Sequence, residues 1–413
     1  MKFGLLGMTL GHSYSPRIHH DLGNTGYELF ECDPSQLSTF FKNPALQGLN
    51  ITIPYKVKAL KACHTVSAIA NRIGCVNTMV RQENGQWYGH NTDYDGFIYM
   101  LRRAHIPIKG NHCLVLGDGA TSKTAHVALT DLGARSITHM SRHTPPTYDA
   151  IEQFYETTQV IINTTPVGMY PHNPDTLINV EAFHHLVGVS DVIYNPHRTG
   201  LLIQADSLGI PSTDGLPMLV AQAVYAAKLF QGQDYDDHTI ESILQSLRQE
   251  LENIVLVGMP GVGKTTVGRQ LAKVLHRPFY DSDDVFLREV GQSSSAYINM
   301  YGEAAFREKE SAILRELGTK TGVVIATGGG CVTVPENYMY LRQNGRIYQI
   351  TRPLEELDMT DRPLSKGGLP ALHQLAAIRT PMYESFAQRT ISNRVVSETV
   401  ALIKEDFYES ISH

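Results

Sequence analysis

The 413-residue sequence has few cysteines and no long apolar segment, and each shortage excludes a class of protein. Its 5 cysteines are scattered and show no CxxC spacing, so the sequence predicts neither a disulfide framework nor a zinc site. No run of about 18 apolar residues occurs, and the first residues turn polar too soon for a signal peptide. We therefore expect a soluble protein of the cytoplasm.

The chain also lacks an excess of positive charge. Its formal net charge is -6, so we expect neither nucleic acid nor a membrane surface as the main partner. Small molecules become the expected partners, while the oligomeric state is left unknown. Hydrophobic residues make up 42% and charged residues 18% of the chain, ordinary values for a globular protein with two or three domains.

No Gly/Ser-rich or Pro-rich linker divides the chain, and no internal repeat is present. Short apolar runs such as HCLVLG, which ends at Gly117, alternate with helix-like segments, and the alternation returns from residue 253. This pattern predicts two separate parallel α/β cores. Residues 239–252 carry apolar side chains on one helical face and are expected to close the first half, with a boundary near residue 250.

The second half opens with an apolar strand and a phosphate-loop pattern, NIVLVGMPGVGKTT, at residues 253–266. Glycines in such a loop let backbone N–H groups surround the phosphates of ATP, while Lys264 neutralises them and the Thr265 hydroxyl meets Mg²⁺. The run that follows the loop favours a helix, as this role requires. The predicted ATP-binding residues are Gly258, Gly261, Gly263, Lys264, Thr265 and Thr266.

Two carboxylates follow at alternate positions, where the next strand should end. Asp281 and Asp283 in YDSDD could be an acidic turn that caps a helix. In the other interpretation, one carboxylate pairs with magnesium and the other takes the proton of an alcohol that receives a phosphoryl group. The motifs GEAAFREKE, ATGGG, DRPLS and RTPMYES come after them in that order.

With these ordered motifs, residues 253 to about 395 resemble shikimate kinase. The resemblance implies that Asp281 joins Thr265 on the magnesium side and that Asp283 binds the substrate diol and acts as the base. It also implies that Arg307 and Arg379 clamp the substrate carboxylate, a task that suits planar guanidinium groups. The backbone at 328–330, including Gly329 and Gly330, would approach the substrate closely.

The resemblance also implies a lid at about residues 354–370. Arg362, in this segment, would reach over the phosphates and stabilise the transferred charge as a catalytic residue. A solvated surface arginine is the alternative interpretation. The segment is shorter than the lid of many relatives and lacks an obvious second arginine just before DRPLS.

The first half contains a glycine loop, GDGATS, at residues 117–122. It follows a strand and opens a helix, but Ser122 replaces the third glycine of GxGxxG, so a plain strand-to-helix turn is the alternative. The next strand ends in HMSRHT, where Ser141 and Arg142 suit the 2′-phosphate of NADP, although Arg142 could also point into solvent. The predicted cofactor contacts here are Gly117, Gly119, Ala120, Ser141 and Arg142.

A series of further motifs surrounds this loop. The series GHSYSP, GLNITIPYK, GCVNT and HNTDYDG precedes it, and INTTPVGMYP, DVIYNP and GLPMLVAQA follow it. Each could be a turn or a helix cap by itself, but the succession resembles shikimate dehydrogenase from residue 1 to about 240. The resemblance implies an α/β substrate-binding domain at 1–100, completed by helices at about 216–250, and a Rossmann-like NADP-binding domain at 101–215. A P-loop kinase domain with a parallel sheet would occupy 251–413.

Reduction of a ring ketone by hydride requires a proton donor and stabilisation of the charge that develops on oxygen. Lys56 and Asp93 match the catalytic pair of the family, and Met218 matches the side chain near the nicotinamide. Hydroxyl groups of Ser13 and Ser15 suit the substrate carboxylate. The residues that match the substrate site are Ser13, Ser15, Thr52, Asn77, Tyr194 and Gln222.

Together, the two resemblances predict a bifunctional enzyme of chorismate and aromatic amino acid biosynthesis. It would reduce 3-dehydroshikimate to shikimate with NADPH and phosphorylate shikimate to shikimate 3-phosphate with ATP and Mg²⁺. One alternative is a quinate-type dehydrogenase fused to the kinase, since one hydroxyl separates the substrates. Another is a ligand-sensing regulator that derives from these enzymes and has lost catalysis. Such a protein should lose its catalytic side chains first, whereas the side chains named above remain.

Overall fold

The computed structural model describes residues 2–11, 13–357 and 368–412, and the chain divides into two compact units. Unit 1 comprises Met1–Asn195 and Gln204–Leu244, and unit 2 comprises Pro196–Ile203 and Gln245–His413. The division passes through two helices, α7 (Gly200–Ser207) and α9 (Asp237–Leu251). No helix in the described ranges is long and apolar enough to cross a membrane.

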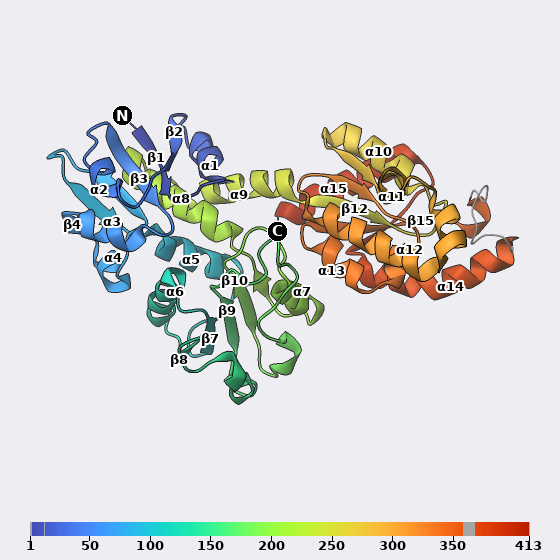
Figure 1. Cartoon of the computed structure of the whole chain (residues 1–413), viewed down its shortest axis with the longest axis horizontal. Coiled ribbons are helices and arrows are strands. Elements are labelled where there is room, and N and C mark those ends of the chain that lie inside the picture. The colour runs from blue at the N-terminus through green and yellow to red at the C-terminus, as the bar shows by residue number, and fades with distance from the viewer. Residues whose placement is uncertain (1, 12, 358–367, 413) are drawn as a thin grey trace. The chain divides into compact units, whose positions relative to one another are not determined.

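Unit 1 contains a mixed six-stranded sheet with the order β2-β1-β3-β5-β6-β4 (Figure 1). Helix α8 carries apolar residues and alanines nearly throughout because it packs against β3 and β5 as well as against α1 and α5. The strands are β1 (Lys2–Gly7), β2 (Tyr27–Glu31), β3 (Leu46–Ile51), β4 (Thr65–Val66), β5 (Thr78–Arg81) and β6 (Trp87–His90). The helices are α1 (Ser15–Asp21), α2 (Leu37–Phe40), α3 (Lys56–Ala62), α4 (Ala68–Ile73), α5 (Thr92–Arg103) and α8 (Leu216–Gln231).

The second sheet of unit 1 is entirely parallel, with the order β11-β10-β9-β7-β8. The chain moves from β7 to β8 on one side and then to β9 on the other, so the strand order reverses beside β7. In such sheets, ligands bind at the carboxyl ends of the strands where the order reverses. The elements are β7 (His112–Leu116), α6 (Ala120–Asp131), β8 (Ser136–Met140), β9 (Val160–Asn163), β10 (Gly188–Asp191) and β11 (Ser212–Thr213).

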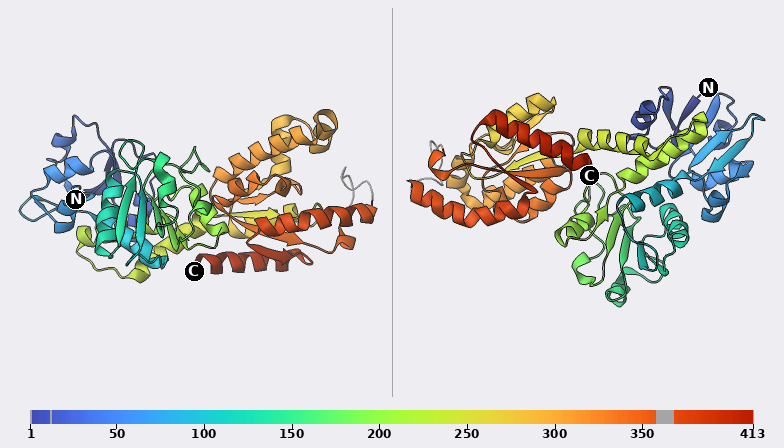
Figure 2. Two further views of the ribbon diagram at one scale, coloured as in Figure 1. Left: turned by 90° about the horizontal axis from the view of Figure 1, so that it is seen from below. Right: turned by 180° about the vertical axis from the view of Figure 1, so that it is seen from behind.

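Unit 2 is built on a five-stranded parallel sheet with the order β13-β14-β12-β15-β16. Its central strand β12 is buried at every residue, as its continuous apolar sequence predicts for a strand covered on both faces. Helices flank both faces of the sheet (Figure 2), with α10 packed on α15 and α12 packed on α13. The predicted α/β fold with parallel sheets is confirmed.

The strands of unit 2 are β12 (Asn253–Val257), β13 (Phe279–Asp281), β14 (Val324–Ala326), β15 (Gly345–Thr351) and β16 (Arg389–Ser392). Its helices are α10 (Lys264–Leu275), α11 (Ser282–Val290), α12 (Ser294–Thr319), α13 (Glu336–Arg342), α14 (Gly368–Phe386) and α15 (Val396–Ser412).

The short segment Pro196–Ile203 belongs to unit 2 because hydrogen bonds join it to the turn between α13 and β15. The His197 N–H donates to Asn344 Oδ1 at 3.0 Å, and the Arg198 N–H donates to the Gln343 carbonyl at 2.7 Å. Gln343 and Asn344 are buried, so these bonds satisfy polar groups that would be costly to leave without partners.

Candidate active sites

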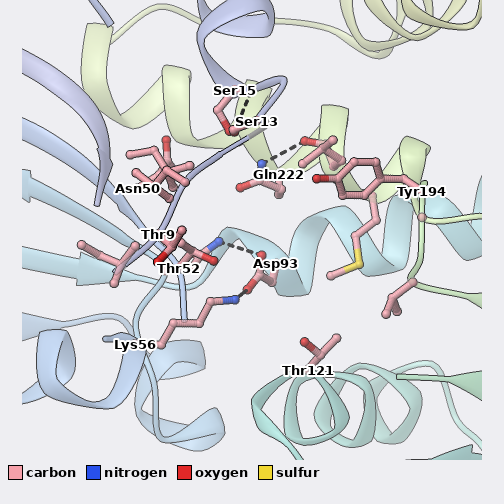
Figure 3. A pocket seen from close by; sticks show the side chains of 18 of the residues that line it. Thr9, Ser13, Ser15, Asn50, Thr52, Lys56, Asp93, Thr121, Tyr194 and Gln222 are labelled. Carbon is pink, nitrogen blue, oxygen red and sulfur yellow. Dashed lines mark hydrogen bonds and ion pairs between the residues drawn. The ribbon is translucent and has the colours of Figure 1, made fainter. Parts of the chain in front are cut away.

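A cavity of about 440 Å³ in unit 1 brings together the residues predicted for the dehydrogenase substrate. They come from the loop after β1 and the start of α1, from the loop after β3 and the start of α3, and from the residue before β5. The others come from the start of α5, the loop after β10 and helix α8 (Figure 3). Of the described residues that line it, only Lys56 and Asp93 carry a charge. The predicted residues in its wall are Ser13, Ser15, Thr52, Lys56, Asn77, Asp93, Tyr194, Met218 and Gln222.

Lys56 and Asp93 form an ion pair at one end of this cavity, although they are 37 residues apart in the sequence. Lys56 Nζ donates to Asp93 Oδ2 at 2.6 Å, and Asn77 Nδ2 donates to Asp93 Oδ1 at 2.9 Å. Asp93 lies in the first turn of α5, where the helix dipole stabilises a negative charge. Burial alone lowers the pKa of Lys56, but the charge and hydrogen bond of Asp93 outweigh burial and raise it above its usual value. The lysine therefore holds a proton that it can donate.

Neutral hydroxyl groups lie at the other end of the cavity (Figure 3). Ser13 precedes α1 and Ser15 begins it, and the Ser15 N–H donates to Ser13 Oγ at 3.2 Å. Ser15 is buried, so its hydroxyl has little competition from bulk water. The two ends of the cavity thus differ: one carries a proton donor and a carboxylate, and the other carries neutral dipoles.

The structure adds residues to this wall that the sequence prediction missed. Asn50, Thr9 and Thr121 also line the cavity. Asn50 stands two residues before Thr52 in GLNITIPYK, and residues two apart share a face of extended chain, so the alternation could have indicated it. Thr9 and Thr121 carry no comparable signal, because Thr9 reaches the cavity from the loop after β1 and Thr121 from the first turn of α6.

A second cavity in unit 1, of about 460 Å³, is lined by Gly117, Gly119, Ala120, Ser141 and Arg142. Helix α6 begins at its wall, and Gly119 at the N-cap provides no side-chain cap for the first N–H groups. Such an open helix N-terminus suits a pyrophosphate. Gly117 has φ +114, and a Cβ there would overlap Thr164, so the loop requires glycine at this position. These features fit a dinucleotide such as NADPH.

Ser141 and Arg142 play different parts in the wall of the second cavity. The Ser141 hydroxyl accepts the N–H groups of His143 at 3.3 Å and Thr144 at 2.9 Å, so it shapes its own turn. Arg142 is exposed at the cavity. Burial raises the pKa of Tyr148, and the positive charge of Arg142 partly offsets this effect. Arg142 therefore presents an exposed positive charge at this cavity.

Ser122, in place of the third glycine of the fingerprint, ties the loop to its neighbouring strand. Its hydroxyl donates to the Gly117 carbonyl at 2.8 Å and also lies 2.8 Å from His139 Nδ1 on β8. A glycine would allow close packing of helix and strand without these bonds. The serine provides a hydrogen-bonded contact instead.

Unit 2 contains a cavity of about 510 Å³ beside the phosphate loop. It includes Phe306 and Ile298 of α12, and Ser294 and Ser295 at the start of that helix. The predicted residues in its wall are Gly261, Gly263, Lys264, Thr265, Thr266, Asp281, Asp283, Arg307, Gly328, Gly329, Gly330 and Arg379. Gly258, the remaining loop glycine, has φ +143, and a Cβ there would overlap the Ile350 carbonyl.

The phosphate loop and the next strand hold the groups predicted for ATP and magnesium. Lys264 Nζ donates to the Gly258 carbonyl at 2.8 Å and to the Met259 carbonyl at 3.1 Å. Thr265 Oγ1 donates to Asp281 Oδ2 at 2.6 Å. A hydroxyl beside a carboxylate provides the hard oxygen ligands that Mg²⁺ prefers. Asp281 also caps α11 by accepting the Asp283 N–H at 3.0 Å, as the helix-cap interpretation predicts, and the metal-side interpretation stays a prediction.

The two arginines predicted for the substrate carboxylate lie in the same cavity. Arg307 is paired with Glu310 at 2.6 Å and with Glu303 at 2.9 Å. Arg379 Nη1 donates to the Gly329 carbonyl at 3.1 Å. A Cβ at Gly330 would overlap the Arg307 guanidinium, so this position must be glycine for the arginine to occupy its place.

Glu310 was missed by the sequence prediction, and Arg362 lies outside the described residues, together with most of the predicted lid. Glu310 lines the cavity, is buried, and has one carboxylate oxygen with no partner among the described residues. It follows Arg307 by three positions on α12, and residues so spaced share a helix face. That spacing in AFREKE could have indicated it.

Comparisons with known proteins agree with the two resemblances found in the sequence. Residues 260–409 match the model of the shikimate kinase family, and residues 5–79 match that of the shikimate dehydrogenase substrate binding domain. A shikimate dehydrogenase (NADP(+)) of Clostridium perfringens is 34% identical over 267 residues, which are 60% of this chain and 98% of the relative.

Two solved structures are also similar to the first part of the chain. One is a chorismate mutase/shikimate 5-dehydrogenase fusion protein from Clostridium acetobutylicum, with 35% identity, a TM-score of 0.56, and coverage of 60% of this chain and 96% of that one. The other is shikimate 5-dehydrogenase from Thermus thermophilus in complex with NADP(H) and shikimate, with 29% identity, a TM-score of 0.53, and coverage of 59% and 97%.

Proposed function

The chain belongs to the shikimate dehydrogenase family and carries a shikimate kinase domain at its C-terminal end, and on this premise we propose a bifunctional enzyme of aromatic amino acid biosynthesis. It reduces 3-dehydroshikimate to shikimate with NADPH, and it phosphorylates shikimate with ATP and Mg²⁺. The observation that carries the proposal is the partly buried Lys56–Asp93 pair, at 2.6 Å, in a cavity that otherwise has neutral walls among the described residues.

In the dehydrogenase reaction, Lys56 acts as the proton donor. NADPH, when bound in the glycine-loop cavity, supplies the hydride. As negative charge develops on the ketone oxygen, Lys56 stabilises it and transfers its proton, while Asp93 holds the ammonium group in place. Ser13 and Ser15 bind the carboxylate at the far end, and the polar side chains of Thr52, Asn77, Tyr194 and Gln222 contact the ring hydroxyls.

In the kinase reaction, Asp283 accepts the proton of the substrate hydroxyl that is phosphorylated. Lys264 binds the phosphates of ATP, exchanging its loop carbonyl partners for phosphate oxygens. Thr265 and Asp281 would hold Mg²⁺, which neutralises phosphate charge when bound. Arg307 and Arg379 bind the substrate carboxylate, so that the hydroxyl faces Asp283 in the same cavity.

The proposal extends to the domain limits, the cofactor preference and the location of the protein. The substrate-binding part is 1–100 with 216–250, the NADP-binding part is 101–215, and the kinase is 251–413. Arg142 gives the preference for NADP over NAD. A cytoplasmic location is supported by the free thiols of the chain, which are Cys32, Cys63, Cys75, Cys113 and Cys331.

Separate assays of the two halves test this proposal. NADPH oxidation should depend on 3-dehydroshikimate, and ADP release from ATP and Mg²⁺ should depend on shikimate. In the reverse direction, shikimate should reduce NADP⁺ with a far higher kcat/KM than quinate. Faster oxidation of quinate would identify the first half as a quinate dehydrogenase, and absence of both activities would identify a regulator.

A further inference from the structure

Asn50, in the wall of the dehydrogenase substrate cavity, is connected to the catalytic pair by a chain of buried hydrogen bonds. The chain begins at Asp93, whose ionised carboxylate can only accept hydrogen bonds. The Asn77 amide therefore turns its NH₂ group to Asp93, at 2.9 Å. Asn77 Oδ1, on its other side, accepts the Thr92 N–H at 2.7 Å and the Thr78 hydroxyl at 3.1 Å.

The direction of these bonds determines the orientation of Asn50. Because the Thr78 hydroxyl donates to Asn77, its oxygen accepts Asn50 Nδ2, at 3.3 Å. Asn50 Oδ1 then accepts the Tyr27 hydroxyl at 2.7 Å and the His19 Nε2 proton at 3.2 Å. A carbonyl oxygen has two lone pairs, and both are used here. One N–H of Asn50 has no partner among the residues that the structure describes and is left for a ligand.

The protonation state of His19 agrees with this direction of the hydrogen bonds. His19 is fully buried on α1, and its ring stacks on Tyr27 with centroids 3.9 Å apart. Burial lowers the pKa of His19 to about 4, despite the opposing hydrogen bond to Asn50, so the ring is neutral near pH 7. Its Nδ1 has no partner among the described residues. The proton of the neutral ring therefore lies on Nε2, where Asn50 accepts it.

We propose that Tyr27 and His19 are positioning residues of the dehydrogenase, which hold the Asn50 amide so that its remaining N–H binds an oxygen atom of the substrate. This inference rests on the proposed function of unit 1. Neither residue lines the cavity, so both act through Asn50. If the Tyr27 hydroxyl is removed, the amide loses its shorter bond and can rotate, and a carbonyl that faces a substrate acceptor would repel it.

The test begins with Tyr27→Phe, which keeps the ring and its stacking on His19 and removes the hydroxyl. KM for 3-dehydroshikimate should rise about tenfold, while kcat changes less than about twofold, because the lost bond orients a binding group rather than the proton donor. His19→Phe should act in the same direction by a smaller factor, since its bond is longer. It also removes a buried nitrogen without a partner, which favours folding.

A double-mutant cycle separates positioning from a general structural effect. Asn50→Ala should raise KM by itself, and adding Tyr27→Phe to Asn50→Ala should raise it no further. Tyr99→Phe is the matched control, since the hydroxyl of this buried tyrosine donates to Glu241, which does not line the substrate cavity. Its KM should equal that of the wild type.

The outcomes separate failure of this inference from failure of the proposed function. A wild-type protein that does not reduce 3-dehydroshikimate would contradict the proposed function. An active wild type with unchanged KM in Tyr27→Phe, or with additive effects in the cycle, would overturn only the positioning role. Kinase activity and circular dichroism of each variant check folding, and if Tyr27→Phe fails to fold, the His19→Phe cycle with Asn50→Ala decides.

Discussion

The two substrate cavities must both bind the carboxylate of a shikimate ring, and we propose different groups for it in each. In unit 1, the groups are the neutral hydroxyls of Ser13 and Ser15. In unit 2, they are the guanidinium groups of Arg307 and Arg379. In this proposal, the chemistry at the other end of a cavity, rather than the substrate alone, decides how an anion is bound.

The charge balance of each reaction explains this contrast. Hydride transfer needs one protonated lysine near the ketone, and a nearby arginine would compete for Asp93 and lower the pKa of Lys56. Phosphoryl transfer gathers negative charge, so additional cations stabilise its transition state. Arg307 forms ion pairs with Glu303 and Glu310. These carboxylates fix the orientation of its guanidinium group and neutralise part of its charge.

The largest expected effect is the loss of one activity, but not the other, when one residue is substituted in either active site. Lys56→Ala removes the proton donor and should lower dehydrogenase kcat by about a hundredfold or more, while kinase kcat stays within about twofold. Asp283→Asn, the matched change in the other half, should give the reverse pattern. Steady-state rates of both reactions measure this, and a Lys56→Ala protein with an unchanged dehydrogenase rate would remove this lysine from the mechanism.

The next prediction compares the two carboxylate sites directly. Arg379→Ala removes a charge-assisted contact and should raise the kinase KM for shikimate by about ten- to a hundredfold. Ser15→Ala removes a neutral contact and should raise the dehydrogenase KM for shikimate by only about three- to tenfold. Both constants are measured with the same substrate. Equal effects of the two substitutions would show that the proposed contrast is wrong.

Arg142 provides the one exposed cation proposed for the cofactor of unit 1. Arg142→Ala should reduce the preference for NADPH over NADH by about tenfold, because the 2′-phosphate loses its charged partner and NADH has none to lose. The ratio of kcat/KM values for the two cofactors measures the change. Equal use of both cofactors by the wild type would contradict the assignment.

The smallest expected change is a displacement of the pH profile. Burial, the largest single effect, lowers the pKa of Lys56 and Asp93 raises it, so the pKa falls when Asp93→Asn removes the charge of the carboxylate. Lys56 must be protonated to donate, and dehydrogenase activity in this variant should therefore be lost at a lower pH than in the wild type. The alkaline limb of the kcat/KM profile tests this, and a limb that moves to higher pH would contradict the role of the pair.

Much of the fold could be predicted from short sequence patterns. Apolar strands such as NIVLV, followed by a glycine loop and a helix, indicate parallel α/β units because each pattern is local. The catalytic pair is different: Lys56 and Asp93 lie 37 residues apart, and no spacing rule brings them together. Their identification depended on family resemblance, and the structure then places them 2.6 Å apart.

Four of the residues that sequence reasoning missed illustrate two different cases. Asn50 and Glu310 lie two and three positions from predicted residues, so the period of a strand or a helix could have indicated them. Tyr27 and His19 contact Asn50 from β2 and α1, and their pairing is produced by tertiary packing alone. A buried polar network of this kind leaves no local pattern in a single sequence.

The central claim is that one chain carries out two successive reactions, and it is tested most directly by a single incubation with 3-dehydroshikimate, NADPH, ATP and Mg²⁺. We predict shikimate 3-phosphate as the final product, with one NADPH oxidised and one ADP released for each molecule formed. Without ATP, the product should be shikimate, and without NADPH, neither product should form. Accumulation of shikimate in the complete mixture, with no release of ADP, would contradict the account.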